Sequence, residues 1–452
     1  MERWNRILLC LLVISMFTFA LCVRSGFAAS GWSQAYGGKG DNEFYSLAQT
    51  SDGGYALVGY TNSSGAGGYD FWLVKTNSSG TMLWNQTYGG SGDDGAFSVI
   101  QTNDTGFALA GTTTSYGAGE TNAWLVKTDS SGNMLWSQTF GGRAQNAAYS
   151  LIQTVDGGYA LAGSTDSYGA GGYDFWLVKT NSSGSMEWNQ TYGGTGDEQA
   201  YSVIQTSDGG YVWAGSATSF GAGSLDFWLV KTDSLGNMLW NRTYGGSGDD
   251  EAECVIQTGD GYAVAGYTNS TGAGGLDLWL VKTDLSGAQL WNKTYGGAGD
   301  EVANAIVQTS DGGYALAGWT GSYGAGNYDF WLVKTYSSGT MQWSKTYGGG
   351  GDDEAFSLVQ TSDGGYALAG FTDSYGAGIY DGFLVKTDSA GNSVMPQSPS
   401  SFPTLYLAIV IVAIIVIIAI VAVFIARRRR PKPSTPPIQQ VPPPPDPGIK
   451  PP

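Results

Sequence analysis

The chain has 452 residues, of which 71 are glycine and none is histidine. Nine of its 21 basic residues but only two of its 38 acidic residues lie outside residues 30–404, which leaves 36 acids against 12 bases in that segment. A surface with this charge repels nucleic acid phosphate, so nucleic acid is not an expected partner. The lack of histidine excludes a histidine general base and a Ser-His-Asp triad.

The N-terminus has the layout of a secretory signal peptide. Two arginines flank the start, an apolar run covers residues 7–23, and small residues follow at Ala28 and Ala29. This pattern predicts a signal peptide over residues 1–29. An uncleaved membrane anchor is the alternative, and either one would export the segment that follows.

Tryptophan recurs through the middle of the chain at a nearly constant interval of 52 residues, with one interval of 51, at Trp32, Trp84, Trp136, Trp188, Trp240, Trp291 and Trp343. Such a period predicts a stacked or circular array. One unit contains four short segments rich in β-branched and aromatic residues, at 96–102, 107–113, 122–128 and 134–140. Several segments are apolar at successive positions, as expected for strands buried on both faces in the blades of a propeller.

The last unit indicates how the array closes. It supplies three strands, at 355–361, 366–372 and 381–387, and no fourth. A strand without a blade of its own stands at residues 31–37. We therefore predict an all-β fold, a seven-bladed β-propeller over residues 30–388 with four-stranded blades, closed by the N-terminal strand. An open solenoid is the alternative, but it would need polar capping repeats, and none is visible.

The repeat resembles a known class. The runs Trp84-Asn-Gln-Thr-Tyr-Gly-Gly-Ser-Gly-Asp-Asp, Asp208-Gly-Gly-Tyr and Asp226-Phe-Trp-Leu-Val-Lys resemble the β-propeller repeats, of the SBBP type and the related delta-60 type, of secreted prokaryotic proteins. The resemblance covers residues 31–388. It implies a propeller fold on an exported surface protein, and it assigns no activity.

Alternating strand directions predict two unlike faces. Long loops such as 165–174 and acidic connections such as 193–198 share one face, whereas short turns such as 206–210 lie on the other. Binding residues usually lie on longer loops held by a rigid scaffold. The candidate ligand-binding residues on the long-loop face are Asp93, Asp94, Asp197, Glu198, Asp249, Asp250, Asp300, Glu301, Asp352, Asp353, Tyr168, Tyr323 and Tyr375.

The acidic pairs allow two interpretations. They could bind cations or hydroxyl-rich glycans, or they could accept backbone hydrogen bonds within Gly-rich turns, which is the interpretation we favour. Their spacing matches no EF-hand or RTX calcium pattern. We also expect structural roles for the turn aspartates (Asp52, Asp104, Asp156, Asp208, Asp260, Asp311 and Asp363) and for the lysines that end each third strand (Lys75, Lys127, Lys179, Lys231, Lys282, Lys334 and Lys386).

No cofactor, no metal and no catalysis are expected. Cys10 and Cys22 lie in the N-terminal apolar run, and Cys254 is alone in the exported region, which excludes a thiolate zinc site there. Cys254 stands where sister repeats have serine, so we expect a small buried side chain. The arginine cluster of a sialidase propeller and the adjacent cysteines of a quinone-dependent propeller are both missing. Paired carboxylates could hydrolyse glycosides, but here they repeat with the blade instead of forming one asymmetric site.

The C-terminal part predicts a membrane anchor. Residues 405–426, which begin at Leu405 and end at Ala426, are apolar and uncharged, long enough for a helix that spans a bilayer. Four arginines follow at once and favour the cytoplasmic side. We therefore expect a linker over 389–404, a transmembrane helix over 405–426, and a basic, then Pro-rich, cytoplasmic tail over 427–452.

Together these features predict a single-pass cell-membrane protein whose propeller faces outward and binds a glycan or a protein, as an adhesion or interaction module. A passive cell-envelope component and a glycan-processing enzyme are the alternatives. Asn-x-Ser/Thr sequons in the exported part would permit N-glycosylation at Asn62, Asn77, Asn85, Asn103, Asn181, Asn189, Asn241, Asn269 and Asn292.

Overall fold

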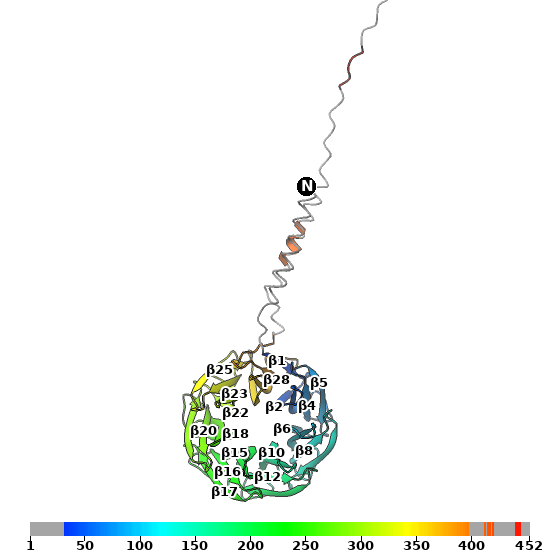
Figure 1. Ribbon diagram of the computed structural model, residues 1–452. Coiled ribbons are helices and arrows are strands. Elements are labelled where there is room, and N and C mark those ends of the chain that lie inside the picture. The colour runs from blue at the N-terminus through cyan, green and yellow to red at the C-terminus, as the bar shows by residue number, and fades with distance from the viewer. Residues whose placement is uncertain (1–30, 397–410, 413, 417, 420–438, 444–452) are drawn as a thin grey trace, which may run out of the picture. The chain divides into compact units, whose positions relative to one another are not determined.

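The computed structural model describes residues 31–396, 411–412, 414–416, 418–419 and 439–443. The chain divides into two compact units, Met1–Pro396 and Gln397–Pro452. Within the first unit, 28 strands form seven four-stranded sheets arranged as the blades of a ring (Figure 1). The predicted seven-bladed propeller of four-stranded blades is confirmed.

Six blades are built from four consecutive strands in chain order from the axis outward, and the seventh takes its outermost strand, β1, from the N-terminal end. The first strands are β2 (Asn42–Gln49), β6 (Asp94–Gln101), β10 (Asn146–Gln153), β14 (Glu198–Gln205), β18 (Asp250–Thr258), β22 (Glu301–Gln308) and β26 (Asp353–Gln360). The second strands are β3 (Tyr55–Thr61), β7 (Phe107–Thr113), β11 (Tyr159–Thr165), β15 (Tyr211–Ala217), β19 (Gly261–Thr268), β23 (Tyr314–Thr320) and β27 (Tyr366–Thr372). The third strands are β4 (Asp70–Thr76), β8 (Asn122–Thr128), β12 (Asp174–Thr180), β16 (Asp226–Thr232), β20 (Asp277–Asp284), β24 (Asp329–Thr335) and β28 (Asp381–Lys386). The fourth strands are β5 (Met82–Tyr88), β9 (Met134–Phe140), β13 (Met186–Tyr192), β17 (Met238–Tyr244), β21 (Gln289–Tyr295), β25 (Met341–Tyr347) and β1 (Trp32–Tyr36).

The hydrophobic core lies between blades. The third strand β4 is buried along its whole length, whereas most of the fourth strand β5 is at least partly exposed. A typical core cluster joins Phe71 and Leu73 of one blade to Val99, Leu109 and Trp124 of the next. Because the second and third strands are covered on both faces, their residues are apolar at successive positions instead of alternating.

The N-terminal strand closes the ring. In the last sheet the order is β1-β28-β27-β26, and the antiparallel register pairs Trp32 with Lys386 and Tyr36 with Gly382. The described chain then continues past β28 and stays packed on the propeller, because the Ser33 hydroxyl donates a hydrogen bond of 2.7 Å to the carbonyl of Val394. The predicted closure is confirmed, and the packed part of the chain extends beyond residue 388.

The first strands carry a bulge that the sequence did not reveal. In β2 the register shifts between Phe44 and Ser46, so Tyr45 is left unpaired. Tyr45 contacts Phe97 and Phe356, its equivalents in the two neighbouring blades, at ring-centroid distances of 5.3 and 4.7 Å. The bulge therefore directs a row of aromatic side chains toward one another across the innermost strands.

Cys254 belongs to a ring of small side chains one position beyond the bulge. The Ser98 hydroxyl accepts a hydrogen bond of 3.1 Å from the backbone N–H of Leu151 in the next blade, and Ser202 accepts one of 3.2 Å from Val255. Cys254 stands at the equivalent position, where it is half-buried instead of buried as expected, and desolvation raises the pKa of its thiol. A thiol with a raised pKa is a poor nucleophile, in keeping with a packing role.

The terminal predictions fall largely outside the described residues. The signal peptide over 1–29 and most of the span over 405–426 lie there, as does most of the cytoplasmic tail. The described residues of the span, 411–412, 414–416 and 418–419, are helical. Among the residues that the structure describes, no helix is long and apolar enough to cross a bilayer.

Candidate ligand-binding face

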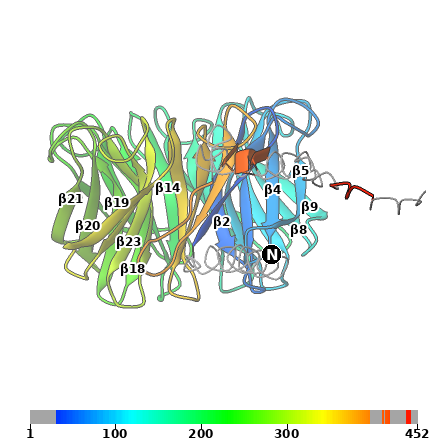
Figure 2. The ribbon, with the colours of Figure 1, turned by 90° about the horizontal axis from the view of Figure 1, so that it is seen from above.

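Loops connect the strands at both ends of the ring of blades (Figure 2), and we call the end that carries two interlocked sets of loops the long-loop face. The backbone N–H of Thr114 donates to the carbonyl of Asp93 at 2.9 Å, and the N–H of Asp94 donates to the carbonyl of Tyr69 at 2.7 Å. Loops from adjacent blades are thereby tied together. The face comprises the second-to-third-strand loops (62–69, 114–121, 166–173, 218–225, 269–276, 321–328 and 373–380) and the connections between blades (37–41, 89–93, 141–145, 193–197, 245–249, 296–300 and 348–352).

The second member of each predicted acidic pair lies inside the protein. Asp94, Glu198, Asp250, Glu301 and Asp353 begin their first strands and are fully buried. In blade two, the carboxylate of Asp94 accepts hydrogen bonds from the N–H of Gly90 at 3.0 Å and from the hydroxyl of Ser115 at 2.7 Å. Hydrogen bonds of this kind, accepted by an aspartate side chain, stabilise Gly-rich turns and agree with the structural interpretation of the acidic pairs.

The first member of each pair is the one that solvent reaches. Asp93 is exposed, and its Oδ1 accepts a hydrogen bond of 3.0 Å from the N–H of Tyr69 in the preceding blade. Asp197 and Asp300 repeat this contact with Tyr173 and Leu276. Asp197 is exposed like Asp93, whereas Asp249, Asp300 and Asp352 are half-buried. Because an ionised carboxylate has about four acceptor positions, Asp93, Asp197 and Asp300 keep acceptor capacity beyond this bond.

A second carboxylate, from the preceding blade, lies beside each buried acid. The virtual Cβ of Gly89 would stand 1.9 Å from Asp70 Oδ1 and 2.7 Å from Asp94 Oδ2, so the two side chains bracket this glycine. Burial, and then the charge of Asp94, raises the pKa of Asp70. At the next blade interface the equivalents are Asn122 and Asn146, so an amide pair fills the same place without charge.

On the opposite, short-turn face, the turn aspartates form salt bridges. Each first-to-second-strand turn aspartate pairs with the lysine that ends a third strand, at 2.8–3.0 Å, through seven bridges. The Thr50 hydroxyl and the Lys75 ammonium hold the pKa of Asp52 at about 2. The expected structural roles of these aspartates and lysines are confirmed. Among the described residues, no acid of the long-loop face forms a salt bridge.

The predicted tyrosines cover the third strands. Tyr168 and Tyr323 are 47% and 46% exposed, and Tyr375 is half-buried. The Tyr323 ring lies 5.7 Å from that of Trp331, and its hydroxyl donates a 2.9 Å hydrogen bond to the carbonyl of Gly296. Each ring has one face on the core and the other toward solvent, as in residues that contact ligands at protein surfaces.

Two of the predicted acids line one cavity. A cavity of 520 Å³ on the long-loop face is bounded by Asp300, Asp352, Asn327 and Tyr328. A smaller one, of 180 Å³, lies in blade three and is lined by Gln145, Tyr173 and neighbouring hydroxyl and amide groups. The larger cavity brings acids of adjacent blades together with a tyrosine and an asparagine, and the smaller one gathers uncharged polar groups with tyrosines, as polar ligands need.

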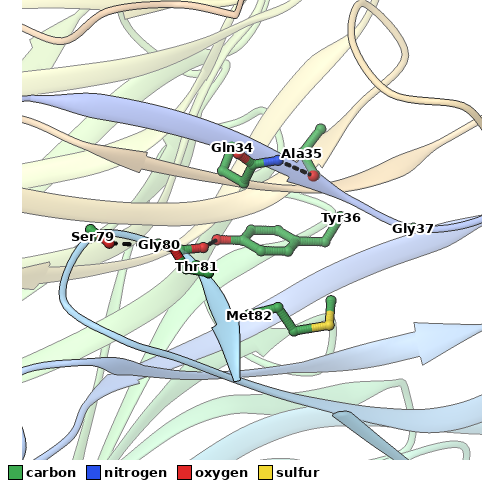
Figure 3. A pocket seen from close by; sticks show the side chains of 8 residues that line it. All are labelled: Gln34, Ala35, Tyr36, Gly37, Ser79, Gly80, Thr81 and Met82. Carbon is green, nitrogen blue, oxygen red and sulfur yellow. Dashed lines mark hydrogen bonds between the residues drawn. The ribbon is translucent and has the colours of Figure 1, made fainter. Parts of the chain in front are cut away.

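A third cavity lies at the ring closure. It has a volume of 390 Å³ and is formed where β1 meets the turn before β5 (Figure 3). Tyr36 points across it and donates a hydrogen bond to the carbonyl of Gly80. The same tyrosine-to-glycine bond recurs at other blades, for example from Tyr88 to Gly132 at 2.6 Å. The contact that forms this cavity is therefore a regular part of the interface between neighbouring blades.

Sequence reasoning missed a group of carboxylates on the innermost strands. Glu43, Glu251 and Glu354 stand two residues before the bulge. Burial, and then Asp352 and Glu43, raises the pKa of Glu354 to about 7. The sequence did contain a signal for these glutamates. Their position varies between blades, whereas the neighbouring positions hardly change.

The sequons lie at the surface. Asn62, Asn85, Asn103, Asn241, Asn269 and Asn292 are exposed, and Asn77, Asn181 and Asn189 are half-buried. None of these nine described side chains is enclosed, so glycosylation there stays a prediction. Among the described residues, no three acidic or cysteine side chains come together so that they could hold a metal ion.

Comparison of the sequence with protein families and with curated proteins gives no match. Solved structures match at low identity. The WD40 domain of Neurospora crassa Pan2 is 10% identical, with 78% of this chain and 90% of that chain covered and a TM-score of 0.46. Sqt1 from Chaetomium thermophilum is 12% identical, with 82% and 87% covered and a TM-score of 0.46.

Proposed function

We propose that this protein is a membrane-anchored cell-surface β-propeller that binds a glycan or a protein through its long-loop face. The observation that carries the proposal is the difference in charge pairing between the carboxylates of the two faces. The turn aspartates of the short-turn face are neutralised by lysines, whereas the long-loop face holds exposed acids, such as Asp93 and Asp197, that pair with no base in the described part of the chain. Unpaired charge on loops that a rigid scaffold holds is the usual setting of binding residues.

The location rests on the sequence at both ends. A signal-like segment over 1–29 and an apolar segment over 405–426 followed by four arginines support an outward propeller and a cytoplasmic tail. The resemblance to SBBP-type repeats agrees with export. The tail, over 427–452, is the part of the chain that cytoplasmic partners would reach.

A glycan-processing enzyme is the second candidate. Glu354, with its pKa of about 7, has the acidity that a general acid needs near neutral pH, and Glu43 contributes to that shift. Against this candidate, the predicted acidic pairs repeat around the ring, and the buried member of each pair is occupied by internal hydrogen bonds. We therefore propose binding without catalysis.

Screening the purified chain against an array of glycans and cell-surface proteins tests the proposal. We expect saturable binding that weakens at high salt, because the carboxylates contribute charge. Self-assembly into ordered arrays without any ligand would instead support a passive envelope component. Turnover of a bound glycan that is lost in Glu354→Gln would support the enzyme.

A further inference from the structure

Blade five departs from the commonest form of the repeat at one surface position, as blade one does with Ser64. In five blades an aromatic side chain of the second-to-third-strand loop covers the aromatic residue of the third strand, as in Tyr116 over Trp124 at 5.3 Å and Phe220 over Trp228 at 5.1 Å. In blade five this position is Thr271, which leaves Trp279 without the cover. A cavity of 240 Å³ stands there.

A second departure from the repeat lines the same cavity. In blades one, three and four the fourth-strand asparagine donates to the sulfur of a methionine, as from Asn85 to Met82 at 3.5 Å. Blade five has Gln289 in place of the methionine, and both Gln289 and Asn292 line the cavity. Two substitutions that are 18 residues apart in sequence therefore make one cavity polar.

An unpaired donor, the indole N–H of Trp279, lies buried beside the cavity. In blades one, three and four the third-strand indole N–H donates to the fourth-strand asparagine, at 3.2, 3.2 and 3.4 Å. Trp279 is only 6% exposed, and its Nε1 has no acceptor among the described residues. A buried donor without a partner costs about 1–3 kcal/mol, so a ligand that accepts this hydrogen bond is favoured.

The backbone offers a matching acceptor. In sister blades the loop tyrosine donates its hydroxyl to a glycine carbonyl, as from Tyr116 to Gly89 at 2.7 Å and from Tyr375 to Gly348 at 2.8 Å. The equivalent glycine in blade five is Gly245, which lines the cavity, and Thr271 has no phenol to place there. The cavity thus lacks both the ring and the hydroxyl that fill the equivalent sites of blades two, six and seven.

We propose that this cavity, the blade-five pocket, binds a single neutral pyranose ring, such as the terminal hexose of a glycan. One hydroxyl would accept a hydrogen bond from Trp279 Nε1, and another would donate one to the Gly245 carbonyl. The side-chain amides of Gln289 and Asn292 would form hydrogen bonds with the remaining hydroxyls. The named lining groups carry no charge, and 240 Å³ is below the roughly 300–1,000 Å³ of drug-sized sites, which suits one ring. A tyrosine side chain of a partner has only one hydroxyl and would leave the amides unpaired.

The inference deepens the proposed function and rests on it only for the export that brings glycans to the domain. Saturation-transfer NMR on the full-length chain, with methyl glucoside, methyl mannoside and methyl galactoside as probes, tests it. At least one hexoside should receive magnetisation. Thr271→Tyr and Gln289→Met, which both return blade five to the residues of its sisters, should weaken its binding at least tenfold and severalfold, respectively. Met341→Gln, the matched change in blade six, should leave the signal unchanged.

No transfer to any hexoside, or equal transfer in Thr271→Tyr, would overturn the pocket. Transfer to p-cresol but not to the hexosides would overturn the sugar assignment. The outcomes distinguish a failure of the blade-five pocket from a failure of the proposed binding function. Array binding that persists in Thr271→Tyr would leave the long-loop face intact as a binding surface, whereas hexoside binding without adhesion would support the pocket alone.

Discussion

At the scale of single residues, the recurring glycine before each first strand is explained by the carboxylates around it. Gly89 lies between Asp70 and Asp94, and Gly245 lies between Asp226 and Asp250 in the same way. A side chain at either glycine would meet oxygen atoms at less than the sum of van der Waals radii. The acids and the glycine therefore form one structural unit, in which each residue requires the others.

Gly89→Ala tests this unit. The new methyl group would lie 1.9 Å from Asp70 Oδ1, so the carboxylate must move and its hydrogen bonds must weaken. We expect the free energy of unfolding to fall by about 1–3 kcal/mol, as for other overpacked sites. Gly350→Ala is the matched control, because a Cβ at Gly350 would meet nothing within 4 Å. Denaturant midpoints that fall equally for the two variants would contradict the account.

The sequence predicted that the acidic residues form turns, but it did not divide each pair into a buried and an exposed member. That division depends on a partner in the preceding blade, since Asp94 begins its strand by donating its N–H to the carbonyl of Tyr69. Nothing local to Asp94 signals this contact. The blade-five pocket was missed for a similar reason, because Thr271 and Gln289 become neighbours only in the folded blade.

At the scale of elements, the closing strand β1 is the one that joins the two ends of the ring. It was predictable because short apolar segments bounded by glycine turns give an unambiguous strand count, and the count left one strand over. The bulge at Tyr45 was not predictable, since it arises where seven strands crowd together at the axis.

Removing residues 31–37 tests the closure. Blade seven would lose its fourth strand, and β28 would become an exposed edge. We expect the melting temperature to fall by more than about 10 °C, since the lost contacts amount to much of a typical domain's 5–15 kcal/mol. A synthetic peptide of residues 31–37 should restore part of this loss, and a scrambled peptide should not. Melting within a few degrees of the parent chain would show that β1 does not lock the ring.

At the scale of the whole molecule, two groups of carboxylates set opposite pH limits. The turn aspartates have a lowered pKa, about 2 for Asp52, so their stabilising contribution is present above the unfolded value near 4 and is lost as the pH falls. Asp70 and Asp353 have a raised pKa, and that of Glu354 is about 7. Their contribution is full below the unfolded value and is lost as the pH rises through the folded value.

These opposite signs predict a stability maximum at mildly acidic pH, between about 4 and 7. Melting temperatures recorded by calorimetry should fall on both sides of that window. Glu354→Gln should flatten the decline near pH 7 because it removes a group that titrates there. A melting temperature that rises steadily from pH 5 to pH 8 would mean that the buried carboxylates do not hold protons in the folded state.

The central claim, that ligands bind at the long-loop face, is tested most directly by a pair of charge-matched variants. One variant changes Asp93, Asp197, Asp300 and Asp352 to asparagine on the long-loop face. The other changes Asp129, Asp233, Asp284 and Asp388 to asparagine in the short turns that follow four of the third strands. Both remove four negative charges and keep an oxygen that can accept the backbone hydrogen bonds. Affinity for the array component that the parent chain binds most tightly should fall at least tenfold in the first variant and stay within about twofold in the second, which corresponds to more than about 1.4 kcal/mol against a few tenths. Equal losses in the two variants, or a loss confined to the second, would contradict the account.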